Sequence, residues 1–448
     1  MEYYSTNGKF GSVSLRQAVV KGLAPDGGLF MPDYIEKFDH KFFEGIGGMS
    51  FPEISFEVAR KFFGGDIDSG HLKKIVYDTL DFDCPVVHIS DNIYSLELFH
   101  GPTMAFKDVG ARFMARLLEY FVRNDSKRLN VLVATSGDTG SAVANGFLGV
   151  EGIHVYVLYP EGRVSKIQES QFTTLGRNIT ALEINGSFDD CQRLVKSAFS
   201  DENLNSKISL TSANSINVAR FLPQSFYYFN AYARLCSDVW KSSPDTGRII
   251  FSVPSGNFGN LTAGLFAAQM GLPVKHFIAA NNENDVVCDY LKTGNYKPRA
   301  SVRTIANAMD VGDPSNFARI LDLYGNSWSA ISRDISGYRY PDDMIRRTIG
   351  EVFSKYGYLT DPHGACACKA LYDYYDEHKE LRNKMEIAGV FLETAHPAKF
   401  PDTVESVVGK GKIPLPERLK TFMSGKRQVT ELGADYNGFR DYLYESVK

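Results

Sequence analysis

The chain has 448 residues, of which 44% are hydrophobic and 23% charged, and its formal net charge is −4 at pH 7. This length allows two or more domains, each with its own core. The slightly negative charge and the lack of a large basic region argue against a nucleic-acid partner. Neither a membrane span nor a secretory signal is predicted, because no long apolar run occurs. Six scattered cysteines favour reduced thiols in a cytoplasmic protein.

Residues 1–95 are expected to form a separate, mostly helical N-terminal segment. They contain a Gly-rich turn, APDGGLFMP, and an amphipathic stretch, FPEISFEVARKFF. A cluster of turn-forming residues, GGDIDSG, interrupts them.

Residues 96–245 are expected to form a first α/β lobe. IYSLELF, which begins just before it, alternates like a strand, and KDVGARFMARLLEYFVR has its apolar residues at helical spacing. NVLVAT is a short apolar run typical of a buried parallel strand, and HVYVLYP and NITALEI repeat that pattern. Helical segments lie between these strands, so the order predicts parallel βαβ units.

Residues 246–448 are expected to form a second α/β lobe, after a Pro/Ser/Asp-rich joint at residues 241–247, KSSPDTG. RIIFSVP, VKHFIAA and IAGVFLE are predicted strands, and LTAGLFAAQMG is a predicted helix. The Pro and Gly residues of KGKIPLPE suggest a C-terminal wrap over the surface. The predicted fold class is therefore α/β, with two lobes of parallel or mostly parallel sheet and helices on both faces.

The segment HGPTMAFKDVG places Lys107 between a predicted strand and a predicted helix. A lysine that forms a Schiff base needs a neutral amine, which a partly desolvated site provides. A loop that enters a helix inside an α/β crevice is such a place. An ordinary surface lysine at a helix start is the alternative.

Two loops that join a strand to a helix are candidate anion sites. ATSGDTGSA places the hydroxyls of Thr135, Ser136 and Thr139 at a helix N-terminus. In PSGNFGN, Gly256 and Gly259 allow the backbone to approach an anion. The alternative for ATSGDTGSA is ordinary helix capping, and the alternative for PSGNFGN is a tight connection between strand and helix.

Two further segments carry polar side chains in suggestive positions. SANSINVAR brings Asn214, Ser215 and Arg220 close together, and arginine binds phosphate through two prongs. LETAHPAKF places Thr394 directly after a predicted buried strand. The alternative for SANSINVAR is a surface loop, and the alternative for Thr394 is a threonine that merely ends a strand. No metal site is predicted, because the histidines lack further ligands at zinc spacing.

The chain carries a lysine loop, then a hydroxyl/Gly loop, then a Gly/Asn loop and then a threonine loop. In this order, these loops resemble those of the tryptophan-synthase-β family of pyridoxal-phosphate enzymes, fold type II. Within it the chain is similar to the threonine synthases of the longer, bacterial and fungal type. The resemblance extends over nearly the whole chain. YSTNGKFGSVSLRQAVVKGLAPDGGLFMP, ELFHGPTMAFKDVGARF and ETAHPAKF carry its specific part, whereas SGDTG and the Gly/Asn loop are shared more widely.

The resemblance implies a role for each candidate residue. Lys107 would be the catalytic, Schiff-base lysine, and Thr394 would contact the pyridine nitrogen of pyridoxal 5'-phosphate. Asp138 would lie beside the cofactor's O3′, where many relatives have Asn although the longer members commonly have Asp. The cofactor phosphate would be held by Gly256, Asn257, Phe258, Gly259 and Asn260. Substrate would be bound by Thr135, Ser136, Thr139, Asn214, Ser215 and Arg220.

The implied activity is the conversion of O-phosphohomoserine and water into L-threonine and phosphate, by a monomer or a homodimer. A catabolic phospho-lyase on the same scaffold is an alternative, which would release 2-oxobutyrate, ammonia and phosphate. A non-catalytic regulator that has kept the fold is a second. A dinucleotide-dependent oxidoreductase is a third, although no GxGxxG motif occurs.

Overall fold

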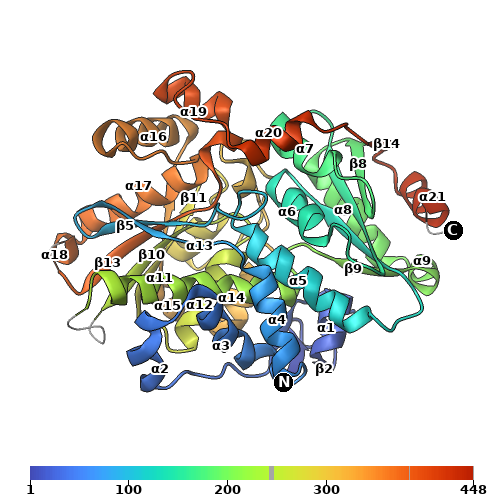
Figure 1. Ribbon diagram of the computed structural model, residues 1–448, viewed down its shortest axis with the longest axis horizontal. Helices are drawn as coiled ribbons and strands as arrows, with labels where there is room; N and C mark the ends of the chain where they lie inside the picture. The colour runs from blue at the N-terminus through green and yellow to red at the C-terminus, as the bar shows by residue number, and fades with distance from the viewer. Residues whose placement is uncertain (242–246, 383, 447–448) are drawn as a thin grey trace. The chain divides into compact units, whose positions relative to one another are not determined.

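The computed structural model describes residues 1–241, 247–382 and 384–446, which form two compact units (Figure 1). Each unit draws on stretches that are far apart in the sequence. Unit 1 comprises residues 1, 31–106 and 221–414, and unit 2 comprises residues 2–30, 107–220 and 415–448. Most of the predicted joint at 241–247 lies outside the described residues. The division at residues 95 and 245 therefore stays a prediction.

Unit 1 is built on a six-stranded sheet, in which only β4 and β5 are antiparallel neighbours. Strands β10 and β13 lie side by side at its centre, with Ser252 opposite Phe391. In spatial order the strands are β12 (Ile335–Arg339), β11 (Val274–Asn281), β10 (Arg248–Pro254), β13 (Ile387–Glu393), β5 (Ile93–Glu97) and β4 (Val86–Ser90).

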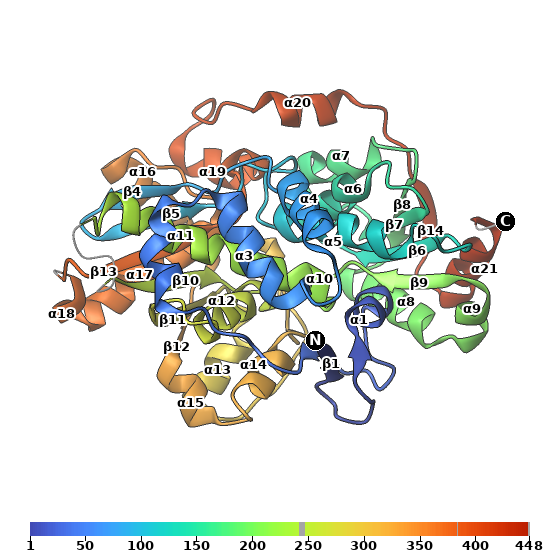
Figure 2. The ribbon, with the colours of Figure 1, turned by 60° about the horizontal axis from the view of Figure 1, so that its bottom comes forward.

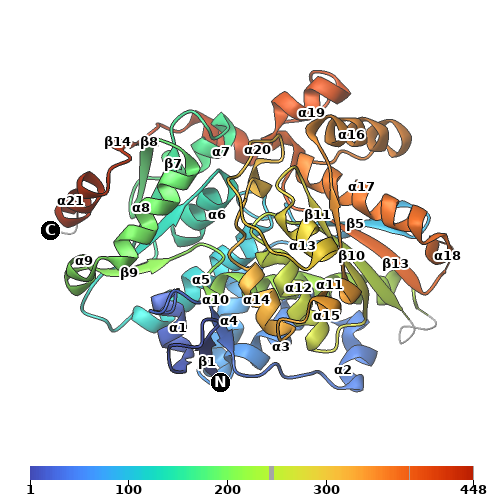
Figure 3. The same cartoon turned by 180° about the vertical axis from the view of Figure 1, so that it is seen from behind.

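Helices cover both faces of this sheet, which explains why its central strands are mainly apolar. Every residue of β13 is buried, as are all residues of β10 after Arg248. Helix α17 packs on one face, and α11 and α12 lie on the other (Figures 1 and 3). The α-helices of unit 1 are α2 (His40–Gly45), α3 (Phe51–Phe63), α4 (Ser69–Thr79), α11 (Ser225–Asp238), α12 (Gly259–Gln269), α13 (Val286–Thr293), α14 (Phe317–Leu323), α15 (Trp328–Asp334), α16 (Asp342–Tyr356), α17 (Pro362–Glu377), α18 (Lys379–Arg382) and α19 (Pro401–Val408). Short 3-10 helices of the same unit are η1 (Ile46–Gly48), η2 (Leu222–Gln224), η4 (Asn307–Met309) and η5 (Pro397–Lys399).

Unit 2 is built on a five-stranded sheet whose neighbouring strands are all parallel. Strand β6 pairs with both β7 and β9, and Leu132 lies opposite Ser212. In spatial order the strands are β14 (Thr430–Gly433), β8 (Ile179–Asn185), β7 (Ile153–Pro160), β6 (Leu129–Ala134) and β9 (Ser209–Ser212).

The helices of unit 2 connect these strands or pack beside them. Helix α5 lies against α6, and α1 lies against α5 and β9. The helices are α1 (Leu15–Lys21), α5 (Lys107–Val122), α6 (Asp138–Phe147), α7 (Lys166–Thr173), α8 (Phe188–Ser200), α9 (Glu202–Lys207), α10 (Val218–Phe221), α20 (Glu417–Ser424) and α21 (Tyr436–Ser446). A small sheet of order β2-β1-β3 precedes them, with β1 (Glu2–Ser5), β2 (Val13–Ser14) and β3 (Phe30–Pro32).

The C-terminal residues contribute regular structure to unit 2. Strand β14 pairs with β8, α20 packs on α7, and α21 packs on α8 (Figure 2). Phe439 and Leu443 of α21 are fully buried in the core that includes Leu194 of α8. A surface wrap was expected here from the sequence, whereas β14 and α21 were not expected.

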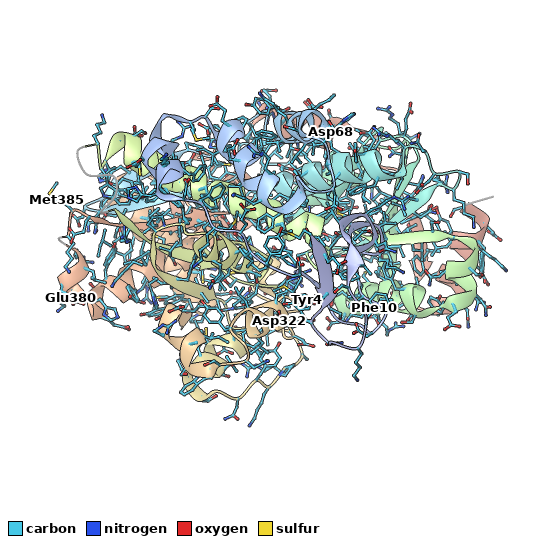
Figure 4. All side chains as sticks on the ribbon, turned by 90° about the horizontal axis from the view of Figure 1, so that it is seen from below. Tyr4, Phe10, Asp68, Asp322, Glu380 and Met385 are labelled. Carbon is cyan, nitrogen blue, oxygen red and sulfur yellow. The ribbon has the colours of Figure 1, made fainter. Side chains whose placement is uncertain are left out.

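Met385 of unit 1 is the most exposed of the large apolar side chains among the described residues, at 88% (Figure 4). All six cysteines are buried and free of disulfides. Among the described residues, none of the helices combines the length and hydropathy that a membrane crossing requires. The predicted fold class, α/β with mostly parallel sheets and helices on both faces, is confirmed.

Candidate functional site

The Gly/Asn loop of unit 1 joins β10 to α12 and leaves the N-terminus of this helix without a side-chain cap. Phe258, the N-cap residue, adopts a left-handed conformation with φ of 61°. Ser255 N–H donates to the carbonyl of Ala280 at 2.8 Å, so the loop is anchored to the adjacent β11. Because the first N–H groups of a helix point outward, this end of α12 suits an anion.

Asn260 adds a buried donor to the same helix end. Its Oδ1 accepts hydrogen bonds from Tyr227 Oη at 2.7 Å and from Tyr228 Oη at 2.8 Å, which fixes the orientation of the amide. Its Nδ2 is buried and has no hydrogen-bond partner among the described residues. A buried amide donor is costly to leave unbonded, so this position is matched to an acceptor such as a phosphate oxygen.

The back of the loop is held by the segment that leads into α14. Ser315 N–H donates to Asn257 Oδ1 at 2.6 Å, and Asn316 Nδ2 donates to the carbonyl of Asn257 at 3.0 Å. A Cβ at position 256 would come within 2.6 Å of the carbonyl oxygen of Ala308. Glycine is therefore required at position 256, because any side chain would displace the loop.

Thr394 lies directly after β13, at the same carboxyl edge as the Gly/Asn loop, because β10 and β13 are parallel neighbours. It is 5% exposed. Its carbonyl accepts a hydrogen bond from Phe106 N–H at 2.9 Å, and Ala105 forms a β-bridge with Ala395. Phe106 immediately precedes Lys107. The residue bonded to the Thr394 carbonyl is therefore the sequence neighbour of the candidate lysine.

Lys107 is the first residue of α5 in unit 2 and is partly buried. Arg220 Nη1 donates to the carbonyl of Lys107 at 3.3 Å, and the Arg220 side chain is only 1% exposed. Gly110, one turn along α5, lies against the Arg220 carbonyl, where a Cβ would overlap the oxygen. Unit 2 thus brings the candidate lysine and the candidate phosphate-binding arginine together.

The SGDTG loop of unit 2 joins β6 to α6. Thr135 Oγ1 accepts hydrogen bonds from the N–H groups of Gly137, at 2.9 Å, and Gly140, at 2.8 Å. This hydroxyl therefore shapes the loop. Asp138 is 4% exposed, and its Oδ1 accepts a hydrogen bond from Gln168 Nε2 at 2.8 Å. Gln168 was not predicted from the sequence, because it follows the next strand and no motif marks it.

The segment after β9 lies beside the SGDTG loop, because β6 and β9 are parallel neighbours. Asn214 Nδ2 donates to the carbonyl of Ala134 at 3.0 Å and links the two loops. The partly exposed candidates in these loops are Ser136, Thr139, Asn214 and Ser215. The predicted substrate-binding residues therefore cluster at one sheet edge in unit 2, and the predicted phosphate loop and Thr394 cluster at one edge in unit 1.

Three buried ionisable residues lie where the end of β13 meets the start of α17. None of them was assigned a role from the sequence. Glu393, Asp361 and His363 are 0%, 0% and 2% exposed. Burial and the negative charge of Asp361 raise the pKa of Glu393 well above its usual range. Although burial opposes it, the interactions with His363 and Glu393 hold the pKa of Asp361 below its usual value. The sequence signal that could have pointed to this group is Glu393 itself, a charged residue at the end of an otherwise apolar strand.

The described residues contain no group of three or more His, Cys, Asp and Glu side chains arranged to hold a metal. His396, two residues after Thr394, is partly buried, and desolvation lowers its pKa to about 4, so it is neutral at physiological pH.

Comparisons with known proteins match these features to one family. Residues 87–391 match the model of pyridoxal-phosphate dependent enzymes. Residues 2–80 match the model of the threonine synthase N terminus, and residues 364–443 that of the threonine synthase C-terminal region. The chain is 42% identical to threonine synthase from Haemophilus influenzae over 447 residues, which cover 100% of both chains.

The chain belongs to the threonine synthase family.

Solved structures of other threonine synthases agree with this assignment. The crystal structure of threonine synthase from Escherichia coli matches with a TM-score of 0.90 and 39% identity, covering 100% of both chains. The pyridoxal-phosphate-bound threonine synthase from Brucella melitensis matches with a TM-score of 0.90 and 36% identity, also covering 100% of both chains. The cofactor of the family is pyridoxal phosphate.

The residues of unit 1 fit this cofactor. The uncapped end of α12 and the buried Nδ2 of Asn260 provide donors for its phosphate. Thr394 provides a hydroxyl, with no fixed charge, at the same sheet edge. This set of donors is chemically matched to a phosphorylated heterocycle.

Proposed function

We propose that the protein converts O-phosphohomoserine and water into L-threonine and phosphate. In this proposal Lys107 carries pyridoxal phosphate, Gly256, Asn257, Phe258, Gly259 and Asn260 hold its phosphate, and Thr394 contacts its ring nitrogen. The observation that carries the proposal is the sheet edge of unit 1. There an uncapped helix with an orphan donor lies beside Thr394, whose carbonyl binds the residue that precedes Lys107.

When bound, pyridoxal phosphate supplies the electron sink that stabilises negative charge at the substrate's Cα. Lys107 Nζ, at the start of α5, removes the proton from Cα and later returns protons to the substrate. Overall, phosphate leaves Cγ and water supplies the hydroxyl at Cβ. Thr394 is a hydroxyl donor without charge, so it does not drive protonation of the ring nitrogen as a carboxylate would.

Residues of unit 2 are proposed to bind the substrate. Arg220 provides a fixed positive charge, and Thr139, Asn214 and Ser215 provide neutral donors for the departing phosphate. Ser136 and the N-terminus of α6 would receive the substrate carboxylate. Thr135 would act by shaping this loop, because its hydroxyl already accepts two backbone hydrogen bonds. Asp138, held by Gln168, would lie beside the cofactor's O3′.

The test is to incubate the purified protein, supplied with pyridoxal phosphate, with O-phosphohomoserine and to measure phosphate, threonine and 2-oxobutyrate together. We expect one threonine for each phosphate released. Phosphate release with 2-oxobutyrate and ammonia as the main products would show a catabolic phospho-lyase instead. No phosphate release at any cofactor concentration would refute the proposal.

We also propose that the protein acts in the cytoplasm on this small-molecule substrate, as a monomer or a homodimer. The absence of disulfides among its six buried cysteines supports a reducing compartment. Light scattering of the purified protein would determine its oligomeric state.

A further inference from the structure

Glu393, Asp361 and His363 lie together in the core of unit 1, under the sheet edge that carries Thr394. Asp361 is the N-cap of α17, and its carboxylate accepts hydrogen bonds from the N–H groups of His363, at 2.8 Å, and Gly364, at 3.3 Å. The helix end and these donors stabilise its negative charge. The three side chains have no role in the proposed chemistry.

Asp361 is joined to both sides of Thr394. On one side, its N–H donates to Glu393 Oε2 at 3.2 Å. On the other side, Ala395 N–H donates to Asp361 Oδ2 at 3.4 Å. Gly364 gives Glu393 the space to approach, because a Cβ at position 364 would overlap Glu393 Oε1. The backbone on either side of Thr394 is thus fixed to the start of α17.

His363 extends the same network to the phosphate loop. Its Nδ1 donates to Asp361 Oδ1, and its Nε2 accepts a hydrogen bond from Ala308 N–H at 3.1 Å. Because Nε2 accepts this hydrogen bond, the tautomer with its proton on Nδ1 fits both contacts. Ala308 in turn packs on Gly256 through its carbonyl oxygen. A continuous set of contacts therefore runs from Thr394 to the back of the Gly256–Asn260 loop.

Glu393 is held as the neutral acid in this network. Burial and the adjacent Asp361 carboxylate raise its pKa, and Glu97 on β5 acts in the same direction. The other ionisable groups that face it are Tyr358 and Cys368, whose pKa values burial raises, so both are neutral at physiological pH. The pair therefore carries one proton, on Glu393, which removes the charge repulsion between the two buried carboxyl groups.

We propose that Glu393, Asp361 and His363 are positioning residues, which hold Thr394 and the Gly256–Asn260 loop in the geometry that binds the cofactor. The inference rests on the proposed function, since it concerns the same cofactor. Loss of one member leaves a buried polar partner unsatisfied and releases one end of the network. Outer contacts of this kind commonly change ligand affinity by about 10–100-fold in metal sites, which sets the scale expected here.

The test compares variants by the dissociation constant of pyridoxal phosphate, measured by titrating the apoenzyme and following intrinsic fluorescence. His363→Asn keeps a donor toward Asp361 but is too short to reach Ala308, whereas His363→Gln places an amide where Nε2 lies. Glu393→Gln keeps a neutral acceptor for Asp361 N–H, and Glu393→Ala removes it. The control is Leu371→Ala, which removes a fully buried side chain from the same helix without touching the network.

We expect His363→Asn and Glu393→Ala to bind the cofactor about tenfold more weakly or worse, on the scale above. His363→Gln and Glu393→Gln should stay within about threefold of the natural protein, on that same scale. Leu371→Ala should lower the Tm of the apoenzyme and leave the dissociation constant unchanged. The inference is overturned if His363→Asn and Glu393→Ala bind as tightly as Leu371→Ala. Failure of the unsubstituted protein to bind pyridoxal phosphate would instead refute the proposed function.

Discussion

The carboxyl edges of the two parallel sheets hold their polar groups in different ways. In unit 1, buried carboxyl and imidazole groups lie beneath the edge, and the helix end above them has an orphan donor. In unit 2, the buried Asp138 and Arg220 are each hydrogen-bonded to a neutral group, and no buried pair of carboxyl groups is described there. The loops of this edge are held by neutral contacts, such as Thr135 with Gly137 and Asn214 with Ala134, and several of its polar side chains remain partly exposed.

This difference matches the two tasks that we assign to the edges. A cofactor stays bound through many turnovers, so its site gains from groups fixed by a buried network. A substrate has to enter and leave, so its site gains from donors that solvent can reach. The two edges can therefore be distinguished by experiment, because damage to the first should change cofactor affinity and damage to the second should change substrate kinetics.

The largest effect is expected for Lys107→Ala. The amine is the proposed proton carrier, and general acid–base groups contribute about 10²–10⁴-fold to rate. Turnover should therefore fall by about 10³-fold or more, while cofactor binding through the Gly256–Asn260 loop persists in weakened form. Steady-state assays and equilibrium dialysis with pyridoxal phosphate would check this. Substantial turnover by Lys107→Ala would contradict the role of Lys107.

Arg220→Ala should damage the substrate edge alone. A charge-assisted hydrogen bond from arginine to phosphate is worth about 1.5–3 kcal/mol, so kcat/KM should fall by at least about tenfold. Because the departing phosphate carries more charge than the bound ester, kcat should fall as well as KM rise. Arg220→Lys should recover part of the loss. A weakened cofactor absorbance with intact substrate affinity would show that the two phosphate sites are exchanged.

A pair of glycine substitutions compares the two edges directly. Gly256→Ala would bring a Cβ to 2.6 Å from the Ala308 carbonyl, and Gly137→Ala would bring one to 2.7 Å from the Gln168 side chain. We expect Gly256→Ala to raise the dissociation constant of the cofactor about tenfold, and Gly137→Ala mainly to raise KM by a similar factor. Equal effects of both variants on cofactor affinity would remove the distinction between the edges.

The last effect concerns the pH dependence of stability and leaves substrate kinetics aside. The folded protein raises the pKa of Glu393 well above the usual value of about 4.5, so the folded state keeps a proton that the unfolded chain loses. The free energy of unfolding should therefore fall as pH rises above about 4.5, by at most about 1.4 kcal/mol per pH unit. Glu393→Gln cannot titrate, so its Tm relative to the natural protein should increase from pH 5 to pH 8. A difference in Tm that does not vary with pH would contradict the neutral Glu393.

The alternating strands and helices could be predicted from the sequence because their signals are local. RIIFSVP and IAGVFLE coincide with β10 and β13, and KDVGARFMARLLEYFV coincides with α5. Strand β14 escaped prediction, because a strand of four half-exposed residues at a sheet edge has no strong apolar pattern. Helix α21 escaped because its buried face consists of two residues, Phe439 and Leu443.

The candidate site residues could be chosen from sequence motifs, but the residues that hydrogen-bond to them and hold them in place could not. Gln168 binds Asp138 across 30 positions, and Ser315 binds Asn257 across 58 positions, with no local pattern that links them. His363 was given no role from the sequence, and its contact with Ala308 spans 55 positions. Such contacts depend on which strands become neighbours in the sheets. A single sequence does not reveal that strand order.

The central claim, that Lys107 carries the cofactor, is tested most directly by reducing the cofactor-loaded protein with borohydride and mapping the labelled peptide. The structure offers a rival in Lys399, which is fully buried and donates from Nζ to the carbonyl of Thr103 at 2.9 Å, in the loop that leads to Phe106. Our account predicts that the label lies on one peptide, the one that contains Lys107. Label on Lys399, or spread over several lysines, would contradict it.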